Sequence, residues 1–204
     1  VVFCLRSRRP PRSPLFPYTT LFRSSIEVNG NGLVTKVVVV DNGSVDGSEA
    51  ACIGRSGVSL VRTGTNLGFG RACNLGAVGA DPGYLLFLNP DAMLRPSTLA
   101  SVVAFLEGPA TRDVGICGVQ LVDESGCIAR SCSRLPTVGR LAAQAVGFDR
   151  VLPRLGCVMA EWDHGATREV EQVIGAFFLV RQSVFEQLGG FDDRFFVYFE
   201  EVDF

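Results

Sequence analysis

Apolar segments of strand length alternate with helix-like segments along most of this chain, and this alternation restricts the fold more than any other feature. In residues 34–40, "VTKVVVV", β-branched residues follow one another as in a strand that is buried on both faces. We expect strands at residues 34–40, 58–62, 84–88, 114–122 and 174–180, and helices at residues 44–53, 67–80, 96–106 and 182–188. Such alternation is typical of βαβ units. The sequence therefore predicts an α/β fold with a mainly parallel sheet flanked by helices.

Two aspartates directly follow buried strands in this pattern. Asp41 comes after residues 34–40, and Asp91 comes after residues 84–88 in the sequence "LFLNPDA". Pro90 ends the second strand because it has no N–H group to donate to the sheet. Ligands of parallel sheets bind beyond the carboxyl ends of the strands, so both carboxylates are candidates for one site. An ordinary turn is the alternative for residues 89–91, since Asn, Pro and Asp all form turns.

The sequence "DNGSVDG" at residues 41–47 carries several oxygen donors but does not fit a calcium loop. Gly43 and Val45 stand at two positions where such a loop needs oxygen ligands. Asp41 is therefore the ligand candidate here, and Ser44 or Asp46 is expected to cap the following helix.

A glycine-containing segment, "NLGFGRACN" at residues 66–74, is predicted to begin a helix. It lacks the G-x-G-x-x-G pattern of dinucleotide-binding folds, because Cys73 stands where the third glycine belongs. Gly68 and Gly70 still allow the backbone to approach a ligand closely, and Arg71 can pair with a phosphate. A glycine-initiated helix with a surface arginine is the alternative.

The last segment, "VIGAFFLVRQSVFEQLGGFDDRFFVYFEEVDF", ends on three acidic residues within an aromatic run. Carboxylates in such surroundings are candidates for general-base chemistry with raised pKa values. The alternative is a helix whose first turn carries acids, which the helix dipole favours. These residues are Glu200, Glu201 and Asp203.

The composition excludes several classes of protein. The 204 residues are 47% hydrophobic and 20% charged, with a net charge of −2, so nothing in the charge favours a nucleic-acid partner. No apolar run reaches the ~18 residues of a membrane-spanning helix. The seven cysteines include no C-x-x-C pair, which argues against a zinc site and favours a reduced, cytoplasmic chain.

The first 24 residues differ from the rest of the chain. They hold five arginines and four of the ten prolines but no acidic residue. The stretch "SPLFPYTTLFRS" resembles translated sequencing-adapter read-through. We expect residues 1–24 to be a disordered, foreign segment, and residues 25–204 to form the functional domain.

Four motifs in order, "VVVVDNGSVDGS", "NLGFGRACN", "LFLNPDA" and the final segment, resemble inverting family-2 glycosyltransferases of the GT-A fold, in particular rhamnosyltransferase-like members. The resemblance covers residues 34–204. It implies a Rossmann-like sheet that is incomplete at both ends, because the family's first strand is not found before residue 25 and the chain stops inside the last motif. The chain is thus expected to be a fragment.

The resemblance also implies how the donor is bound. Asp41 corresponds to the aspartate that reads the nucleotide base. Asn66, Gly68 and Arg71 correspond to the loop that lines the nucleotide-sugar pocket. The implied donor is a dTDP- or UDP-sugar, with rhamnose or a similar sugar transferred.

The same resemblance assigns the metal, the acceptor and the base. Asn89 and Asp91 form the degenerate D-x-D motif, in which Asp91 binds Mg²⁺ or Mn²⁺ on the donor diphosphate. Gly175 and Ala176 correspond to small residues beside the acceptor, a glycan or polyprenyl-linked saccharide of the cell envelope. The pair Glu200–Glu201 corresponds to the family's Glu-Asp pair, whose second member is the catalytic base. Glu200 and Asp203 stay open as alternatives to Glu201.

Further expectations concern the surroundings of this site. The aromatic residues at 195–199 are expected to exclude water from the base, and His164, the single histidine, is expected on the surface. Peripheral contact with the inner face of a membrane is compatible with the implied acceptor. An inactive nucleotide-sugar-binding fragment is the alternative function. A nucleotidyltransferase is less well supported. Such an enzyme would require a glycine-rich loop with arginine and lysine after the first strand, whereas the single lysine, Lys36, lies within a predicted strand.

Overall fold

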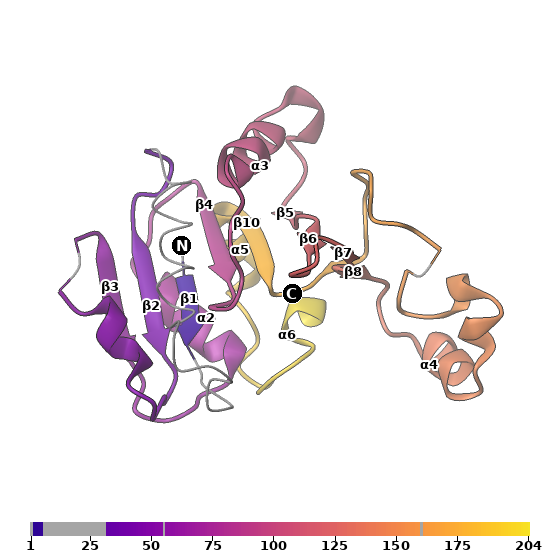
Figure 1. The fold of residues 1–204 in the computed structure, drawn as a ribbon, viewed down its shortest axis with the longest axis horizontal. Coiled ribbons are helices and arrows are strands. Elements are labelled where there is room, and N and C mark those ends of the chain that lie inside the picture. The colour runs from indigo at the N-terminus through magenta and orange to yellow at the C-terminus, as the bar shows by residue number, and fades with distance from the viewer. Residues whose placement is uncertain (1, 6–31, 55, 160) are drawn as a thin grey trace. The chain divides into compact units, whose positions relative to one another are not determined.

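A six-stranded sheet forms the core of the larger of two compact units in the computed structural model, which describes residues 2–5, 32–54, 56–159 and 161–204 (Figure 1). The larger unit comprises Val1–Cys117 and Gly175–Phe204, and the smaller unit comprises Gly118–Ile174. The strand order is β3-β2-β1-β4-β10-β5. These strands are β1 (Val2–Leu5), β2 (Val37–Asp41), β3 (Val58–Arg62), β4 (Tyr84–Leu88), β5 (Ile116–Cys117) and β10 (Phe177–Arg181).

The first four strands of this order are parallel, and the last two reverse direction in turn. β1 pairs in parallel with β2 on one side and with β4 on the other. β10 runs antiparallel to β4, with Phe178 opposite Phe87, and β5 runs antiparallel to β10. The predicted α/β fold with a mainly parallel sheet is confirmed. The alternation of strands and helices in the sequence did not predict that β10 runs antiparallel to β4.

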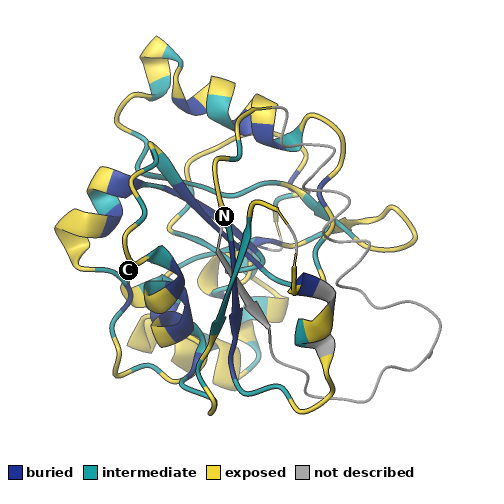
Figure 2. Cartoon of the chain, turned by 90° about the vertical axis from the view of Figure 1, so that its left-hand side faces the viewer, coloured by how far each residue is buried: buried dark blue, intermediate teal, exposed yellow. Residues whose placement is uncertain are grey.

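The core lies where β4 and β10 meet the C-terminal segment. Residues 85–88 of β4 and 177–180 of β10 are buried, as the dark blue strands in Figure 2 indicate. A cluster of phenylalanines packs against them, with ring centroids 5.2 Å apart for Phe87 and Phe191 and 5.1 Å apart for Phe191 and Phe204. Burying a phenylalanine contributes roughly 1.5–3 kcal/mol to stability. Phe191 and Phe204 therefore anchor the last motif to the sheet.

Helices cover this sheet at positions close to those predicted. α2 (Phe69–Ala77) contacts β1 and β2, and it buries small residues that let the helix approach the sheet closely. The others are α3 (Thr98–Leu106), α5 (Gln182–Leu188), α6 (Glu200–Asp203) and the 3-10 helix η2 (Pro109–Thr111). α5 has the predicted bounds and ends at Gly189, whose left-handed conformation stops the helix.

The helix predicted at residues 44–53 is instead a short 3-10 helix, η1 (Ser48–Cys52). Its N-cap is Gly47, with a φ of 72°, and no side chain caps it. The expectation that Ser44 or Asp46 caps this helix is therefore wrong. The Ser44 N–H donates to Asp41 Oδ1 at 3.0 Å, which keeps the chain after β2 in a turn.

The absence of a strand before residue 25 is also a wrong expectation. β1 (Val2–Leu5) lies in the middle of the sheet, with Phe3 opposite Val39 on one side and Leu88 on the other. Four apolar residues suffice for a central strand, but they stand directly before an Arg/Pro-rich stretch whose composition hid them. Residues 6–24, which we expected to be disordered, lie outside the described residues.

The smaller unit contains short elements only. Two two-stranded sheets pair β6 (Leu121–Val122) with β7 (Ile128–Ala129) and β8 (Cys132–Ser133) with β9 (Gln172–Val173). They are accompanied by α4 (Val138–Ala145) and the 3-10 helices η3 (Phe148–Arg150) and η4 (Pro153–Leu155). The single strand predicted at residues 114–122 is thus divided into β5 and β6. None of the helices in the described residues is long and apolar enough to cross a bilayer.

Candidate functional site

The carboxyl ends of β2 and β4 lie at the same edge of the sheet, as we predicted from the positions of Asp41 and Asp91 after these strands. Asp41 is the last residue of β2 and is 4% exposed. Its backbone carbonyl accepts the N–H of Thr63 at 3.0 Å, which joins it to the end of β3. A buried carboxylate that is fixed on a strand end is a suitable acceptor for the N–H of a ligand.

Asn42 is the residue that the sequence analysis missed at this edge. It is 1% exposed, and its amide nitrogen donates to Asn66 Oδ1 at 2.9 Å and to the Gly68 carbonyl at 3.0 Å. Its Oδ1 accepts the N–H of Leu67 at 2.8 Å. Asn42 thus ties the end of β2 to the glycine-containing loop and orients Asn66. Its position after a buried strand was the available signal, but asparagine is also an ordinary turn residue.

The glycine-containing loop makes a close contact with the C-terminal segment. The Phe69 N–H donates to the Phe196 carbonyl at 3.1 Å. Gly68 has a φ of +94°, and a Cβ atom built there would lie 2.3 Å from the Phe196 carbonyl oxygen. A Cβ at Gly70 would lie 3.1 Å from Phe191 Cβ and 3.5 Å from Glu200 Cβ. The two glycines therefore let the loop lie directly against the segment that carries the candidate base.

Arg71 and Asn74 extend this contact along α2. Arg71 Nε donates to the Asp193 carbonyl at 3.0 Å and lies 3.8 Å from Asp193 Oδ2. Asn74 donates to the Phe191 carbonyl at 2.8 Å and accepts the Phe191 N–H at 2.9 Å. Arg71 is exposed and already engaged with Asp193. Only Nε takes part in this contact, so the terminal N–H groups of the guanidinium remain to pair with a phosphate.

Asn89 and Asp91 lie in the turn that follows β4. The Asn89 N–H donates to the Ala176 carbonyl at 3.2 Å, because β10 begins where β4 ends. This contact brings the "NPD" turn beside Gly175 and Ala176, which the sequence analysis associated with the acceptor. Asp91 itself is exposed.

The donor set at this turn fits a metal ion that arrives with a phosphorylated ligand. Among the described residues, no three His, Cys, Asp or Glu side chains are grouped so that they could hold an ion by themselves. Mg²⁺ at nucleotide sites uses one or two protein carboxylates and completes its shell with phosphate oxygens and water. The exposed carboxylate of Asp91 can supply that protein ligand.

Glu200 and Glu201 open the short helix α6 and have unusual surroundings. Glu200 is 4% exposed, and its Oε2 is buried without a hydrogen-bond partner among the described residues. Oε2 of Glu201 is buried and unpartnered in the same way. A Cβ built on Gly175 would lie 3.4 Å from the Phe69 ring and 3.8 Å from Glu201 Oε1, so Gly175 lies beside both side chains. Asp203, by contrast, is exposed.

Burial raises the pKa of Glu200 above its ordinary value, and the neighbouring charge of Glu201 adds to this rise. The folded chain therefore keeps the Glu200 proton at pH values where the unfolded chain has lost it. The stability of the folded chain consequently falls as the pH rises through this window.

Glu200→Gln is expected to raise the melting temperature relative to the wild type at pH 7 but not at pH 4, below the ordinary pKa of Glu. The amide has no proton to lose, so the variant escapes the cost of a buried charge. Thermal melts of both proteins across this range measure the difference. Glu124→Gln, at an exposed turn position, is the control and should melt in parallel with the wild type. Equal pH dependence of Glu200→Gln and the wild type would contradict the assignment.

The aromatic residues before this helix do not form the expected wall around the base. Phe196, Tyr198 and Phe199 are 53–66% exposed. Tyr198 and Phe199 have φ values of 68° and 69°, in the left-handed region that bulky residues rarely adopt. These side chains therefore lie at the surface, while Glu200 is buried beside Gly70 of α2.

His164 lies in the smaller unit and is 5% exposed, so its expected surface position is wrong. Its ring stacks on Trp162 with centroids 4.2 Å apart, and Gln120 Nε2 donates to its backbone carbonyl at 2.8 Å. Burial lowers the pKa of His164, and the positive charge of Arg130 adds to this effect. Trp162, two residues earlier in the same loop, supplies this packing, so an aromatic neighbour was the available signal in the sequence.

Comparison with known proteins gives this arrangement a family context. Residues 20–130 match the sequence family described as Glycosyl transferase family 2. The chain is 32% identical, over 202 aligned residues, to the N-acetylglucosaminyl-diphospho-decaprenol L-rhamnosyltransferase of Mycobacterium tuberculosis (strain CDC 1551 / Oshkosh). The alignment covers 92% of this chain and 64% of that relative, so the chain spans somewhat less than two thirds of the relative's length.

Solved structures share the fold at low sequence identity. S. aureus TarS 1–349 matches with a TM-score of 0.61 at 15% identity, over 98% of this chain and 52% of that one. GalNAc-T7, solved with UDP, GalNAc and Mn²⁺, matches with a TM-score of 0.62 at 14% identity, over 98% of this chain and 38% of that one. These neighbours have the GT-A architecture, so the predicted fold class is confirmed.

Proposed function

Because this chain belongs to glycosyltransferase family 2, we propose that it transfers a sugar from a nucleotide-diphosphate donor to an acceptor hydroxyl with inversion at the anomeric carbon. The transferred sugar is rhamnose or a close relative. The acceptor is a saccharide carried on a polyprenyl diphosphate. The M. tuberculosis relative, whose name specifies rhamnosyl transfer to such a lipid-linked sugar, supports both choices.

One observation carries the proposal: Glu201 Oε2 is buried without a hydrogen-bond partner among the described residues, and the other oxygen of the same carboxylate, Oε1, lies close to Gly175. A buried acceptor without a donor is unfavourable unless a ligand hydroxyl or a proton supplies one. An acceptor hydroxyl that enters beside Gly175 would donate to this carboxylate. Glu201 is therefore the proposed general base, ahead of the more deeply buried Glu200 and the exposed Asp203.

The donor is proposed to bind along the carboxyl edge of the sheet. Asp41 accepts the ring N–H that uracil and thymine share, which makes both UDP- and dTDP-sugars suitable. The loop that contains Asn66 and Gly68 lines the sugar-nucleotide pocket, and its backbone is fixed there by Asn42. Arg71 pairs with the phosphates through the terminal N–H groups of its guanidinium, while Nε holds Asp193.

Asn89 and Asp91 are proposed to bind the metal–diphosphate end of the donor. A bound Mg²⁺ or Mn²⁺ would neutralise charge on the departing nucleoside diphosphate. Asp91 would hold this ion, and Asn89 would be positioned by its contact with Ala176. The Mn²⁺ in the GalNAc-T7 structure supports a divalent ion in this architecture.

The proposed reaction forms one bond and breaks one. The acceptor oxygen bonds to the anomeric carbon while the bond from that carbon to the diphosphate oxygen breaks, and the nucleoside diphosphate leaves. Attack comes from the face opposite the leaving group, so the configuration inverts. The hydroxyl proton passes to a carboxylate oxygen of Glu201. A lipid-linked acceptor would locate this reaction at the inner face of a membrane.

Calorimetric titration of the chain with UDP and dTDP, with and without Mn²⁺, tests the donor site. We expect binding that depends on Mn²⁺ and that weakens at least about tenfold in Asp91→Ala, because the variant lacks the protein ligand of the ion. The control is Asp113→Ala, an exposed aspartate that precedes β5. Since β5 runs parallel to β4 through β10, Asp113 lies at the opposite edge of the sheet. No binding of either nucleotide to folded chain would overturn the proposed donor site.

A further inference from the structure

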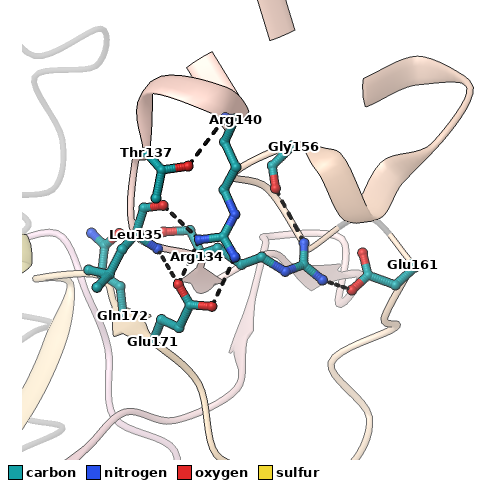
Figure 3. A network of polar contacts seen from close by, with 9 residues as sticks. Arg134, Leu135, Thr137, Arg140, Gly156, Glu161, Glu171 and Gln172 are labelled. Atoms are coloured by element: carbon teal, nitrogen blue, oxygen red, sulfur yellow. Dashed lines mark hydrogen bonds and ion pairs between the residues drawn. The ribbon is translucent and has the colours of Figure 1, made fainter. Parts of the chain in front are cut away.

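Helix α4 of the smaller unit exposes its apolar face and uses its arginine, Arg140, for contacts within the unit. Arg140 points inward: its guanidinium donates to both carboxylate oxygens of Glu171 at 2.7 and 3.1 Å and to the Leu135 carbonyl at 2.8 Å (Figure 3). This pairing holds the pKa of Glu171 below its ordinary value. The charged side of the helix is therefore the side that is fixed to the rest of the unit.

The opposite side of α4 is apolar and exposed. Residues 138, 141, 142 and 145 follow the i, i+3, i+4, i+7 spacing of one helix face, and all four are exposed. Val138 is 86% exposed and Leu141 is 51% exposed. In a helix that packs on a core, such a face is buried and the arginine points to solvent. α4 shows the reverse arrangement.

A second row of exposed apolar residues runs through η3, η4 and the turn between them. It consists of Phe148, Val151, Leu152 and Leu155, which are 42–77% exposed. α4, η3 and η4 contact one another, so both rows belong to one compact piece of chain. Residues 135–155 hold eight of the 22 large apolar side chains that are exposed among the described residues. We call this piece the α4–η4 surface.

The charge of the α4–η4 surface differs in sign from that of the whole chain. Residues 135–155 contain three arginines and one aspartate, which gives +2, whereas the chain carries −2 and its remainder therefore −4. Arg140 is occupied by Glu171, but Arg150 and Arg154 are exposed among the apolar residues. Such a surface is complementary to an anionic bilayer: the apolar side chains can contact the acyl chains, and the arginines can contact the phosphates of the headgroups.

We propose that the α4–η4 surface docks on a membrane that contains anionic lipids. The apolar rows enter the boundary between headgroups and acyl chains, and Arg150 and Arg154 bind lipid phosphates. The inference goes beyond the proposed function, because it rests on the exposure and charge of residues 135–155 and needs neither donor nor acceptor. It is compatible with an acceptor that is anchored in the same membrane.

Flotation of the 204-residue chain with lipid vesicles tests this proposal. We expect the chain to float with vesicles of equal parts phosphatidylcholine and phosphatidylglycerol and only weakly with pure phosphatidylcholine. The double variant Phe148→Asp/Val151→Asp should lower the partition coefficient at least about tenfold, because two apolar anchors are replaced by like charges of the lipid. Arg150→Ala should lower it roughly fivefold, and added salt should weaken binding of the wild type.

A matched control changes two apolar residues that are exposed elsewhere. Val78→Asp/Leu188→Asp alters side chains that are 73% and 52% exposed in the larger unit, and it should float like the wild type. Circular dichroism and nucleotide titration of the same samples check folding and keep this test separate from that of the donor site.

Three results would overturn the proposal. The first is folded wild-type chain that stays with the lipid-free fraction. The second is a Phe148→Asp/Val151→Asp variant that floats as well as the wild type. The third is a dimer in sedimentation velocity that the same double variant dissociates while vesicles bind neither protein. In that case the α4–η4 surface would belong to an interface between two copies of the chain.

Discussion

Glu201→Gln is expected to lower kcat for sugar transfer by about 10²–10⁴-fold while the affinity for the nucleotide donor stays unchanged. The amide keeps the shape of the side chain but cannot take the proton of the acceptor hydroxyl. Release of nucleoside diphosphate in the presence of a saccharide acceptor measures kcat, and calorimetric titration measures donor affinity. A fall in both quantities would indicate a folding or binding defect instead of a lost base.

Two further variants separate Glu201 from its alternatives. Asp203→Asn is expected to retain most of the activity, because Asp203 is exposed on the short helix α6. Glu201→Asp should retain more activity than Glu201→Gln, since a carboxylate remains although it is shorter by one methylene. If Glu200→Gln abolished turnover and Glu201→Gln did not, the base would be Glu200 and the role proposed for Gly175 would be wrong.

Gly68→Ala is expected to lower the free energy of unfolding by about 3 kcal/mol or more. Gly68 has a φ of 94° and a ψ of 169°, a backbone conformation that is essentially restricted to glycine and that costs an alanine roughly 1–3 kcal/mol. The new Cβ atom would also stand 2.3 Å from the Phe196 carbonyl oxygen, and forcing the backbone apart adds roughly 1–3 kcal/mol. For a chain of this size, the loss corresponds to a melting temperature lower by about 6–12 °C. Chemical denaturation and thermal melts measure both quantities.

Gly79→Ala measures the cost of a positive φ without a steric clash. Gly79 has a φ of +67°, but a Cβ atom there would meet nothing within 4 Å. Its substitution should therefore cost only the conformational part, ~1–2 kcal/mol. Equal losses for the two alanine variants would mean that the loop and the C-terminal segment are not held together at Gly68.

The regular elements with strong local signals could be predicted from the sequence. The bounds of β3, β4 and α5 agree with the predicted ranges, because each is a short apolar or amphipathic run that ends on a proline, glycine or charged residue. β1 could not be found in this way. Its place in the sheet depends on pairing with β2 and β4, which lie more than 30 residues further along the chain.

The candidate site was predictable as a set of segments but not as a set of contacts. Strand ends and glycines pointed to Asp41, Gly68 and the "NPD" turn. The role of Asn42 depends on a partner 24 residues away, and the closeness of Gly70 to Glu200 spans 130 residues. Contacts of this kind arise from the tertiary packing and leave no periodic pattern in the sequence.

The reversal of β10 also affects the order in which the sheet can be completed. β4 has β1 on one side, but its other side is paired with β10, which begins 89 residues after β4 ends. A ribosome that adds ~5–20 residues per second needs roughly 5–20 s to make that stretch. Throughout this interval one edge of an apolar strand is without its partner, which is the condition under which nascent chains pair with the wrong strand or aggregate. Pairings so distant in sequence also slow folding. Completion of the sheet where β4 meets β10, and with it the contact between Asn89 and Ala176, is therefore a late event in the folding of this chain.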